Sequence, residues 1–348
     1  MNWFERLTGF AEDENGYVAT QRKLRVEGDH LISTVNGRRY RIGAFTLPTL
    51  ADLRARADVG GGKRSSLAGL VGDARALHRD PEFDGALFQV ASQFNVLEMV
   101  SPHVTPEQGV GCYAHDPTQG PACAIAAGAA TIYRNYLVPV GGGVGQTADR
   151  QIDTLAAVGA VLADLTGMPA TRLWSMQNGY ALATADGLAA IGAALRGAGE
   201  DVRDAVREQL SIGLHSDVEV TDAEGEPRPR VSQAFCSALP VGYSDLSRRQ
   251  WEPFARLILE STYEATLLAA AEQAARGGSS TVLLTTVGGG AFGNDIAWIL
   301  DAIERAMGVV EHAGLDIRIV GHRDISPGIR RLISDWAEGG RPDGRCVD

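Results

Sequence analysis

Residues 288–294 read Gly-Gly-Gly-Ala-Phe-Gly-Asn, and this segment points to chemistry more clearly than any other part of the chain. A β-rich run precedes it and a helical pattern follows, so backbone N–H groups at the start of that helix could hold an anion. Glycine lets the backbone approach a phosphate and adopt positive φ without a Cβ clash. The spacing matches neither a P-loop nor GxGxxG. A tight strand-to-helix turn is the alternative, but the density of glycines favours a loop that binds a nucleotide-like ligand.

A second polar segment, residues 89–98, reads QVASQFNVLE. A hydrophobic run ends there in side chains that carry hydroxyl, amide and carboxylate groups: Ser92, Gln93, Asn95 and Glu98. Such groups at a strand end can orient a sugar hydroxyl or a water molecule. The alternative is a polar turn that satisfies its own backbone.

A third segment, residues 109–124, reads GVGCYAHDPTQGPACA and precedes a helix with Pro121 at its start. Its candidate ligand-binding or catalytic residues are Gly109, Gly111, His115, Asp116, Gln119 and Gly120. The glycines and the helix start predict a second anion-binding loop.

The cysteines raise the question of a metal site. Cys112, His115 and Cys123 could ligate zinc, but their spacing matches no compact zinc motif and no fourth ligand is evident, so no metal is expected. Cys236 lies in an apolar strand pattern typical of a buried, inert thiol. With Cys346 the chain has four cysteines, too few for a disulfide scaffold, which favours a reducing, cytoplasmic setting.

The elements that must position these residues are clearest in the last third of the chain. We expect a long helix over residues 251–276, a buried strand over 280–287, a helix over 295–307 and a strand over 315–322. An earlier buried strand covers residues 86–91. Helices that alternate with short, continuous apolar strands indicate a mixed, mostly parallel sheet covered by helices on both faces.

The rest of the chain is predicted in less detail. The expected elements are helices over 121–139, 146–165, 187–195 and 202–210, a strand or hairpin over 173–183, an exposed hairpin tip over 216–230 and a strand over 231–244. Near the N-terminus, alternating residues around Asn36-Gly37 predict a hairpin, and residues 49–57 a short helix. Residues 59–66 are flexible in composition and favour a linker, with a loop that touches a ligand as the alternative.

This pattern predicts three parts. They are an N-terminal hairpin and helix appendage over 1–82, an α/β domain over 83–325 with an enlarged middle over 140–230, and a C-terminal tail over 326–348.

The composition excludes some classes of function. The formal net charge of -11 argues against non-specific binding to nucleic acid, whose phosphates would be repelled. No stretch approaches the ~20 apolar residues that a membrane helix needs, and the N-terminus lacks the apolar core of a signal peptide. We therefore expect a cytoplasmic protein with no membrane partner.

The order of elements over residues 83–320 resembles a divergent macrodomain, the ADP-ribose-binding α/β fold. In that family an early strand ends in an Asn-bearing turn, as QVASQFN does, and a Gly-rich loop then enters a helix, as in GVGCYAHDPTQGPACAIAAG. A core strand ends in a small-Pro segment, as FCSALPVGY does. LLTTVGGGAFGNDIAWILDAIERAM is similar to the final strand, Gly-x-Gly-x-Phe/Tyr-Gly loop and helix. The N-terminal hairpin has no counterpart in the family.

The resemblance implies a ligand and a set of contacts. Residues 288–294 would wrap the distal phosphate and ribose, with Phe292 near that ribose, Asn95 on its hydroxyls and residues 109–120 facing the pyrophosphate. The implied ligand-binding residues are Gln93, Gly109, Gly111, Gln119, Gly120, Gly288, Gly289, Gly290, Ala291, Phe292, Gly293 and Asn294. The expected partner is ADP-ribose or an ADP-ribosylated substrate, and no further cofactor is expected.

The implied reaction is hydrolysis of an ADP-ribosyl linkage on a protein, a nucleic acid or a small nucleotide conjugate, in which water attacks the anomeric carbon through an oxocarbenium-like state. The implied catalytic residues are Asn95, Glu98, His115 and Asp116, and the base is Glu98, Asp116 or His115. Two alternatives remain: a non-catalytic reader of ADP-ribose or nucleotides, and a zinc-assisted hydrolase using Cys112, His115 and Cys123.

Overall fold

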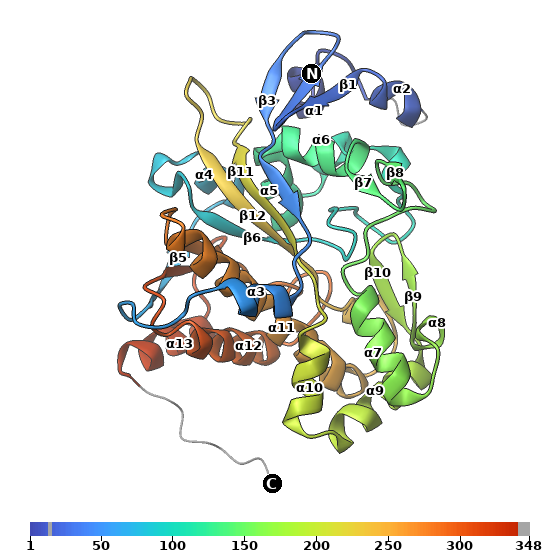
Figure 1. The fold of residues 1–348 in the computed structure, drawn as a ribbon, viewed down its shortest axis with the longest axis vertical. Helices are drawn as coiled ribbons and strands as arrows, with labels where there is room; N and C mark the ends of the chain where they lie inside the picture. The colour runs from blue at the N-terminus through green and yellow to red at the C-terminus, as the bar shows by residue number, and fades with distance from the viewer. Residues whose placement is uncertain (13–15, 340–348) are drawn as a thin grey trace.

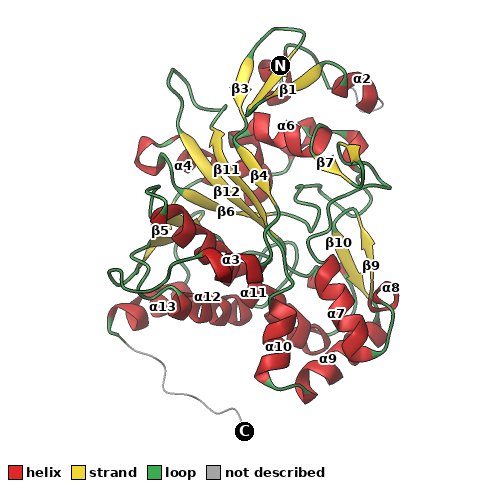
Figure 2. Cartoon of the chain, viewed as in Figure 1, coloured by secondary structure: helices red, strands yellow, loops and turns green. Residues whose placement is uncertain are grey.

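The computed structural model describes residues 1–12 and 16–339, and its centre is a seven-stranded sheet (Figures 1 and 2). In spatial order the strands are β4 (Ala44–Thr46), β11 (Gly213–Glu219), β12 (Arg230–Cys236), β6 (Leu87–Ala91), β13 (Thr281–Leu284), β14 (Asp316–Gly321) and β5 (Ser66–Val71). The last five are mutually parallel, whereas β11 and β4 are antiparallel to their neighbours. The predicted mixed, mostly parallel sheet is confirmed.

Helices cover both faces of this sheet, as predicted (Figure 1). One face carries α3 (Leu50–Arg56), α11 (Arg248–Ala275) and α12 (Ile296–Val309), and the other carries α4 (Ala74–Arg79), α5 (Gln119–Ala126) and α6 (Gly128–Tyr136). The alternation of strand side chains produces the two cores. Val282 and Leu284 of β13 join the core under α11 and α12, while Leu283 between them joins the core under α4 and α5.

The N-terminal segment forms α1 (Trp3–Thr8), α2 (Tyr17–Gln21) and a small sheet of β1 (Leu24–Glu27), β2 (His30–Ser33) and β3 (Arg39–Arg41). The hairpin predicted around Asn36-Gly37 is the β2–β3 pair. The helix predicted over 49–57 is α3, which begins with a capping box between Thr49 and Asp52. Phe4 and Leu31 share a core with Ile132 of α6, so the small sheet is packed onto the main domain.

The domain boundary predicted at residue 83 separates two strands of the main sheet from the other five. Both edge strands of the main sheet, β4 and β5, come from the predicted appendage. They are only three and six residues long, and their partners lie far along the chain: β4 pairs with β11, and β5 with β14. Such pairings leave little local signal, so the sequence pattern does not place these strands in the main sheet.

The middle of the chain builds a helical layer beside the sheet (Figure 2). It contains α7 (Ala156–Thr166), α8 (Ala170–Leu173), the predicted hairpin as β9 (Trp174–Gln177) and β10 (Tyr180–Ala183), α9 (Ala185–Gly197) and α10 (Glu200–Arg207). The helix predicted over 146–165 begins only at Ala156. Gln146 explains the difference because its side chain binds the main chain of Asn95, Arg134 and Ile152 and holds its own segment outside the helix.

Two further helix predictions need correction. The single helix expected over 121–139 is divided into α5 and α6 at Ala127, whose φ of -106° and ψ of 55° are not helical. The predicted C-terminal tail contains α13 (Pro327–Ala337), capped by the Ser326 side chain. Trp336 of α13 donates to the Ser65 carbonyl at 2.9 Å and so ties the helix beside β5. Residues 340–348, with Cys346, lie outside the described residues.

Within residues 1–12 and 16–339, we find no helix with the length and apolar character that crossing a membrane requires.

Candidate active site

A cavity of about 810 Å³ lies where the five parallel strands end. We call it the strand-end cavity. Residues at the end of each of these strands, or just after it, line the cavity: Ala91, Ser92 and Gln93 at β6, Ala238 after β12, Thr285 to Val287 after β13, Gly321 and His322 at β14, and Gly72 and Asp73 after β5. The carboxyl ends of parallel strands meet at one edge of a sheet, the usual place for a ligand in an open α/β fold. Its volume is that of a small-molecule site.

The glycine-rich loop after β13 forms one wall of this cavity, and three of its residues give the loop its shape. Gly288 and Gly293 have φ of 77° and 69°, which favour glycine. Asn294 closes the loop, since its backbone N–H donates to the Gly288 carbonyl at 2.9 Å and its side-chain amide to the Leu239 carbonyl at 2.8 Å. A Cβ on Gly289 would lie 3.2 Å from Cδ1 of Ile299 and 3.2 Å from the Thr286 carbonyl oxygen, so the site is tight. Gly289, Gly293 and Asn294 do not line the cavity.

Gly290 differs from these residues because no structural requirement explains its lack of a side chain. Its φ is not positive, and a Cβ placed on it would meet no atom of the described chain within 4 Å. Gly290 lines the cavity together with Ala291 and Phe292. A glycine that the fold does not require, facing a cavity, is compatible with the close approach of a ligand to the backbone.

Glu98 lines the same cavity, and only 3% of it is exposed. Its Oε1 atom lies 3.4 Å from the Arg134 guanidinium, while its Oε2 atom is buried and has no hydrogen-bond partner among the described residues. Burial raises the pKa of Glu98 to about 7, although Arg134 and the hydrogen bond with Tyr113 act in the opposite direction. A carboxyl that is half ionised near neutrality and has a free oxygen is suited to proton transfer.

The turn that carries Glu98 is held firmly in place. Arg134 is fully buried, stacks 3.7 Å above the Phe235 ring centroid, and donates from Nε to the Val96 carbonyl at 3.2 Å. Val96 has a φ of 58°, which is unusual for a β-branched residue. Strained backbone of this kind persists where the surroundings determine it, often beside functional groups. Arg134 thus positions Glu98 both through the turn and through its charge.

The start of α5 packs directly over Glu98. A Cβ on Gly120 would lie 2.1 Å from the Ala91 carbonyl oxygen and 3.1 Å from Cγ of Glu98, so only glycine fits there. Gln119 lines the cavity, but its amide is already engaged: it accepts from the Ala91 N–H and donates to the Gln89 carbonyl, both at 2.9 Å. Gln119 therefore fastens α5 to β6 through both atoms of its amide group.

The structure brings most of the predicted site residues together. Those that line the strand-end cavity are Gln93, Glu98, His115, Asp116, Gln119, Gly120, Gly288, Gly290, Ala291 and Phe292. His115 ends the short helix η3 (Gly111–His115) and Asp116 follows it, with its carboxylate accepting from the Thr118 N–H at 2.9 Å.

Asn95 does not line the strand-end cavity, contrary to the prediction from sequence. It is fully buried, donates to the Gln151 side chain at 2.9 Å and accepts from the Leu97 N–H at 3.1 Å. These bonds brace the turn before Glu98. The ribose contact implied for Asn95 finds no support in this geometry.

Gly109 and Gly111 do not line the strand-end cavity either, although the sequence predicts that they bind the ligand. The N–H groups of Val110 and Gly111 bind the carboxylate of Glu12, at 2.9 Å for Val110, and Tyr136 donates to the same carboxylate at 2.7 Å. A Cβ on Gly109 would lie 2.4 Å from the Glu12 carboxyl carbon. The predicted anion-binding loop does bind an anion, but that anion belongs to the chain itself and lies away from the strand-end cavity.

Sequence reasoning missed the aromatic wall of the cavity. Tyr180 of β10 and Tyr243 of η4 (Val241–Tyr243) line it beside Phe292, with ring centroids 5.2 to 5.6 Å apart. The three residues lie far apart in the sequence, and no local pattern connects them. Asp73, His322 and Asp324 at the ends of β5 and β14 were also missed, although their position after apolar runs was a usable signal.

The proposed zinc ligands do not form a set. Cys112 is exposed and Cys123 is fully buried. Across residues 1–12 and 16–339, no group of three or more His, Cys, Asp or Glu side chains is arranged to hold a metal ion.

Comparison with known proteins gives weak likenesses only. No family model and no curated protein matches the chain. Among solved structures, poly(ADP-ribose) glycohydrolase from Deinococcus radiodurans in complex with ADP-ribose is 14% identical, with 84% of this chain and 95% of that chain covered and a TM-score of 0.44. The enzyme from Thermomonospora curvata bound to the inhibitor ADP-HPD is 13% identical, with 97% and 99% covered and a TM-score of 0.40.

Proposed function

We propose that the protein binds ADP-ribose, or a nucleotide very similar to it, in the strand-end cavity and hydrolyses an ADP-ribosyl linkage, with Glu98 acting on the attacking water. The observation that carries this proposal is the Glu98 carboxyl, which is buried at the cavity wall with one oxygen unpartnered and a pKa raised to about 7. An unsatisfied buried carboxyl costs stability, and such groups concentrate at functional sites.

Three features support a nucleotide as the ligand. The cavity has the volume of a small-molecule site at the ends of parallel strands. Gly290 leaves the backbone of the glycine-rich loop open to close approach by a phosphate or ribose. Tyr180, Tyr243 and Phe292 offer aromatic faces and edges to a ribose or a base. The resemblance of the sequence to a divergent macrodomain favours ADP-ribose within this class.

The chemistry follows from the position of Glu98. In its ionised form Glu98 accepts a proton from water as the water oxygen bonds to the anomeric carbon and the glycosidic bond breaks. The leaving atom keeps the bonding pair and takes a proton from solvent. Because Glu98 is required in its ionised form, turnover should rise about tenfold per pH unit below pH 7 and level off above it.

The direct test uses the whole chain. ADP-ribose binding is measured by calorimetry, and release of ADP-ribose is followed with an ADP-ribosylated protein, an ADP-ribosylated DNA and a small ADP-ribosyl conjugate. Binding with release from at least one substrate supports the proposal. Binding without release from any of them makes the protein a reader of ADP-ribose. An absence of binding at millimolar ADP-ribose overturns the proposal.

A further inference from the structure

A second cavity, of about 920 Å³, lies between α9, α10 and the first half of α11, and it shares no lining residue with the strand-end cavity. We call it the arginine cleft. The charged residues that line it are Arg196, Arg203, Arg207, Arg249, Arg256, Glu252 and Glu260. Five arginines against two glutamates is an unusual local balance on a chain with a net charge of -11.

Two of the five arginines are neutralised by the chain. Arg207 is buried and pairs with Glu260 at 2.6 Å and Glu200 at 2.7 Å. Arg256 pairs with Glu252 at 2.9 Å and with Asp301 at 2.6 Å. These pairs also use up both glutamates of the cleft.

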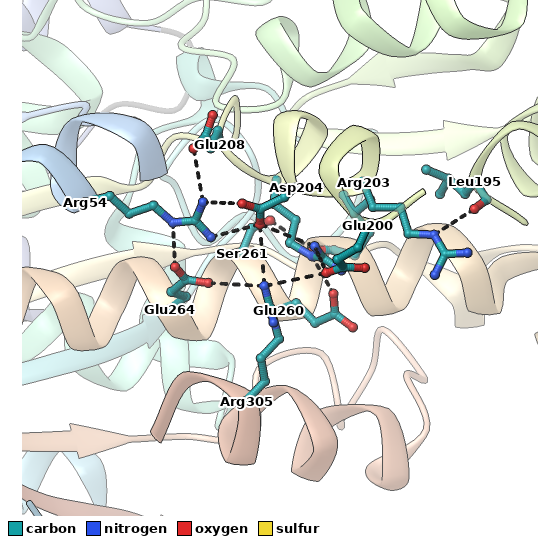
Figure 3. A network of polar contacts seen from close by, with 12 residues as sticks. Arg54, Leu195, Glu200, Arg203, Asp204, Glu208, Glu260, Ser261, Glu264 and Arg305 are labelled. Atoms are coloured by element: carbon teal, nitrogen blue, oxygen red, sulfur yellow. Dashed lines mark hydrogen bonds and ion pairs between the residues drawn. The ribbon is translucent and has the colours of Figure 1, made fainter. Parts of the chain in front are cut away.

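The other three arginines keep their charge without a carboxylate partner among the described residues. Arg203 donates from Nε to the Leu195 carbonyl at 2.8 Å, a neutral acceptor (Figure 3), and its two terminal nitrogens form no hydrogen bond or ion pair with the described residues. Arg196 and Arg249 make no hydrogen bond or ion pair with any side chain in residues 1–12 and 16–339.

Arg249 is also unfavourable for the helix that carries it. It occupies the first turn of α11, where the helix dipole disfavours a cation, and that turn contains no acidic residue. Its neighbour Arg248 is compensated by Asp295 at 3.5 Å, whereas Arg249 is not. A residue that opposes local stability without compensation within the described fold is a candidate for a functional role.

The walls of the cleft are held rigidly behind these arginines. Figure 3 shows the ion-pair network that joins α3, α10 and α11: Arg54 of α3 binds Glu264 of α11 at 2.6 Å and Asp204 of α10 at 2.7 Å. Arg305 of α12 contacts Asp204 at 3.5 Å. The cleft is therefore preformed, which lowers the entropic cost of binding.

The floor of the cleft is apolar. Leu188, Leu195 and Leu257 line it, and each is at most 4% exposed. An apolar floor with a rim of unpaired guanidinium groups fits an organic anion that has an apolar body and a charged end. Guanidinium forks match the several oxygens and the double charge of a phosphate group better than a single carboxylate. A long polyanion fits less well because it would extend over an acidic surface.

We propose that the arginine cleft is a binding site for a small phosphate ester with an apolar moiety, separate from the strand-end cavity. This site does not depend on the function proposed above. Arg196, Arg203 and Arg249 bind the phosphate, and the leucine floor takes the apolar moiety.

The test is calorimetry of the full chain with 1-naphthyl phosphate, inorganic phosphate and phthalate as probes. All titrations are made in the Gly290→Val background, so that the strand-end cavity does not contribute. The cleft variant is Arg196→Gln/Arg203→Gln/Arg249→Gln. Its control, Arg22→Gln/Arg172→Gln/Arg331→Gln, removes the same charge from exposed arginines outside the cleft.

We expect 1-naphthyl phosphate to bind the unmodified cleft more tightly than inorganic phosphate or phthalate does. The cleft variant should lose at least about tenfold in affinity, and the control should lose less than twofold. Arg249→Glu, a single exposed change that the helix dipole favours, should weaken binding without unfolding the chain. Equal losses in the cleft and control variants, tighter binding of phthalate, or no binding of either phosphate probe would overturn the proposal.

Discussion

Glu12 is half-buried and Glu98 is buried, and each carboxylate lies beside glycine-rich backbone. The two carboxylates differ in their hydrogen bonds. Glu12 accepts hydrogen bonds from Val110, Gly111 and Tyr136. Glu98 has one oxygen with no partner among the described residues and faces the strand-end cavity. The first arrangement stabilises the fold, since buried polar groups are normally satisfied. The second costs stability and keeps a reactive group available. The comparison predicts that changes at Glu12 weaken the fold, whereas changes at Glu98 alter function and the pH dependence of stability.

The largest expected effect is on the pH dependence of stability at Glu98. Its pKa is raised from 4.5 to about 7 in the folded protein, so the folded state binds more protons than the unfolded state between these values. The contribution of Glu98 to the free energy of unfolding is greatest below about pH 4.5 and is lost as the pH rises to 7. Between pH 4.5 and 8 the difference in unfolding free energy between Glu98→Gln and wild type should shift in favour of the variant by up to about 3 kcal/mol.

Urea unfolding at several pH values measures this difference. Glu304 provides a comparison because its pKa is also raised but the residue is only partly buried, so Glu304→Gln should change the pH dependence far less. A pH-independent difference between wild type and Glu98→Gln would show that Glu98 is ionised throughout.

The next effect is on ligand affinity at Gly290. Gly290→Val should weaken ADP-ribose binding at least about 100-fold, or about 2.7 kcal/mol, because the added side chain enters the cavity. The melting temperature should stay within about 2 °C of wild type, since nothing lies within 4 Å of the new Cβ. Gly60→Val, another open glycine but outside the cavity, is the control and should bind normally. Unchanged affinity in Gly290→Val would remove the loop from the ligand site.

A smaller effect is expected at Glu12, where a substitution should lower stability and leave ligand affinity nearly unchanged. Glu12→Gln should lower the unfolding free energy by about 2 kcal/mol because it weakens hydrogen bonds to a charged acceptor. ADP-ribose affinity, measured where the variant is folded, should change less than twofold. A large loss of affinity with unchanged stability would instead place Glu12 in the binding site.

The smallest expected effect is at Asn95, whose side chain braces the turn without lining the cavity. Asn95→Ala should cost about 1 kcal/mol of stability by removing its bonds with Gln151 and Leu97, and leave ADP-ribose affinity within about twofold. Denaturation and calorimetry on the same preparation check both. A tenfold loss of affinity would restore the ribose contact that the sequence resemblance implied.

The sequence predicted the parts of the fold that local pattern controls. Continuous apolar runs identified β6, β13 and β14, and residues 251–276 identified most of α11. The edge strands β4 and β5 were not recognised as part of the sheet because they are short and depend on distant partners. The break between α5 and α6 was missed because Ala127 carries no helix-breaking signal, while Thr221, far along the chain, receives the Gly128 N–H.

For the candidate site, too, the sequence predicted what local pattern controls and not what distant contacts decide. Strand-end position correctly brought Gln93, Glu98 and Gly290 to one cavity. The sequence could not show which polar side chains form hydrogen bonds within the protein, because the partners of Asn95 and Gln119 are set by tertiary packing. Nor could it place Tyr180 and Tyr243, which meet Phe292 only in the folded chain.

The most direct test of the central claim is a paired measurement on Glu98→Gln: its ADP-ribose affinity by calorimetry and its rate of ADP-ribose release from the substrate that wild type cleaves fastest. A residue that acts only in the transition state affects the rate and not the affinity. We predict an affinity within about threefold of wild type and a rate reduced by at least ~100-fold, with Asp116→Asn as the matched carboxylate control that retains most of its rate. A Glu98→Gln variant with the wild-type rate would contradict the account.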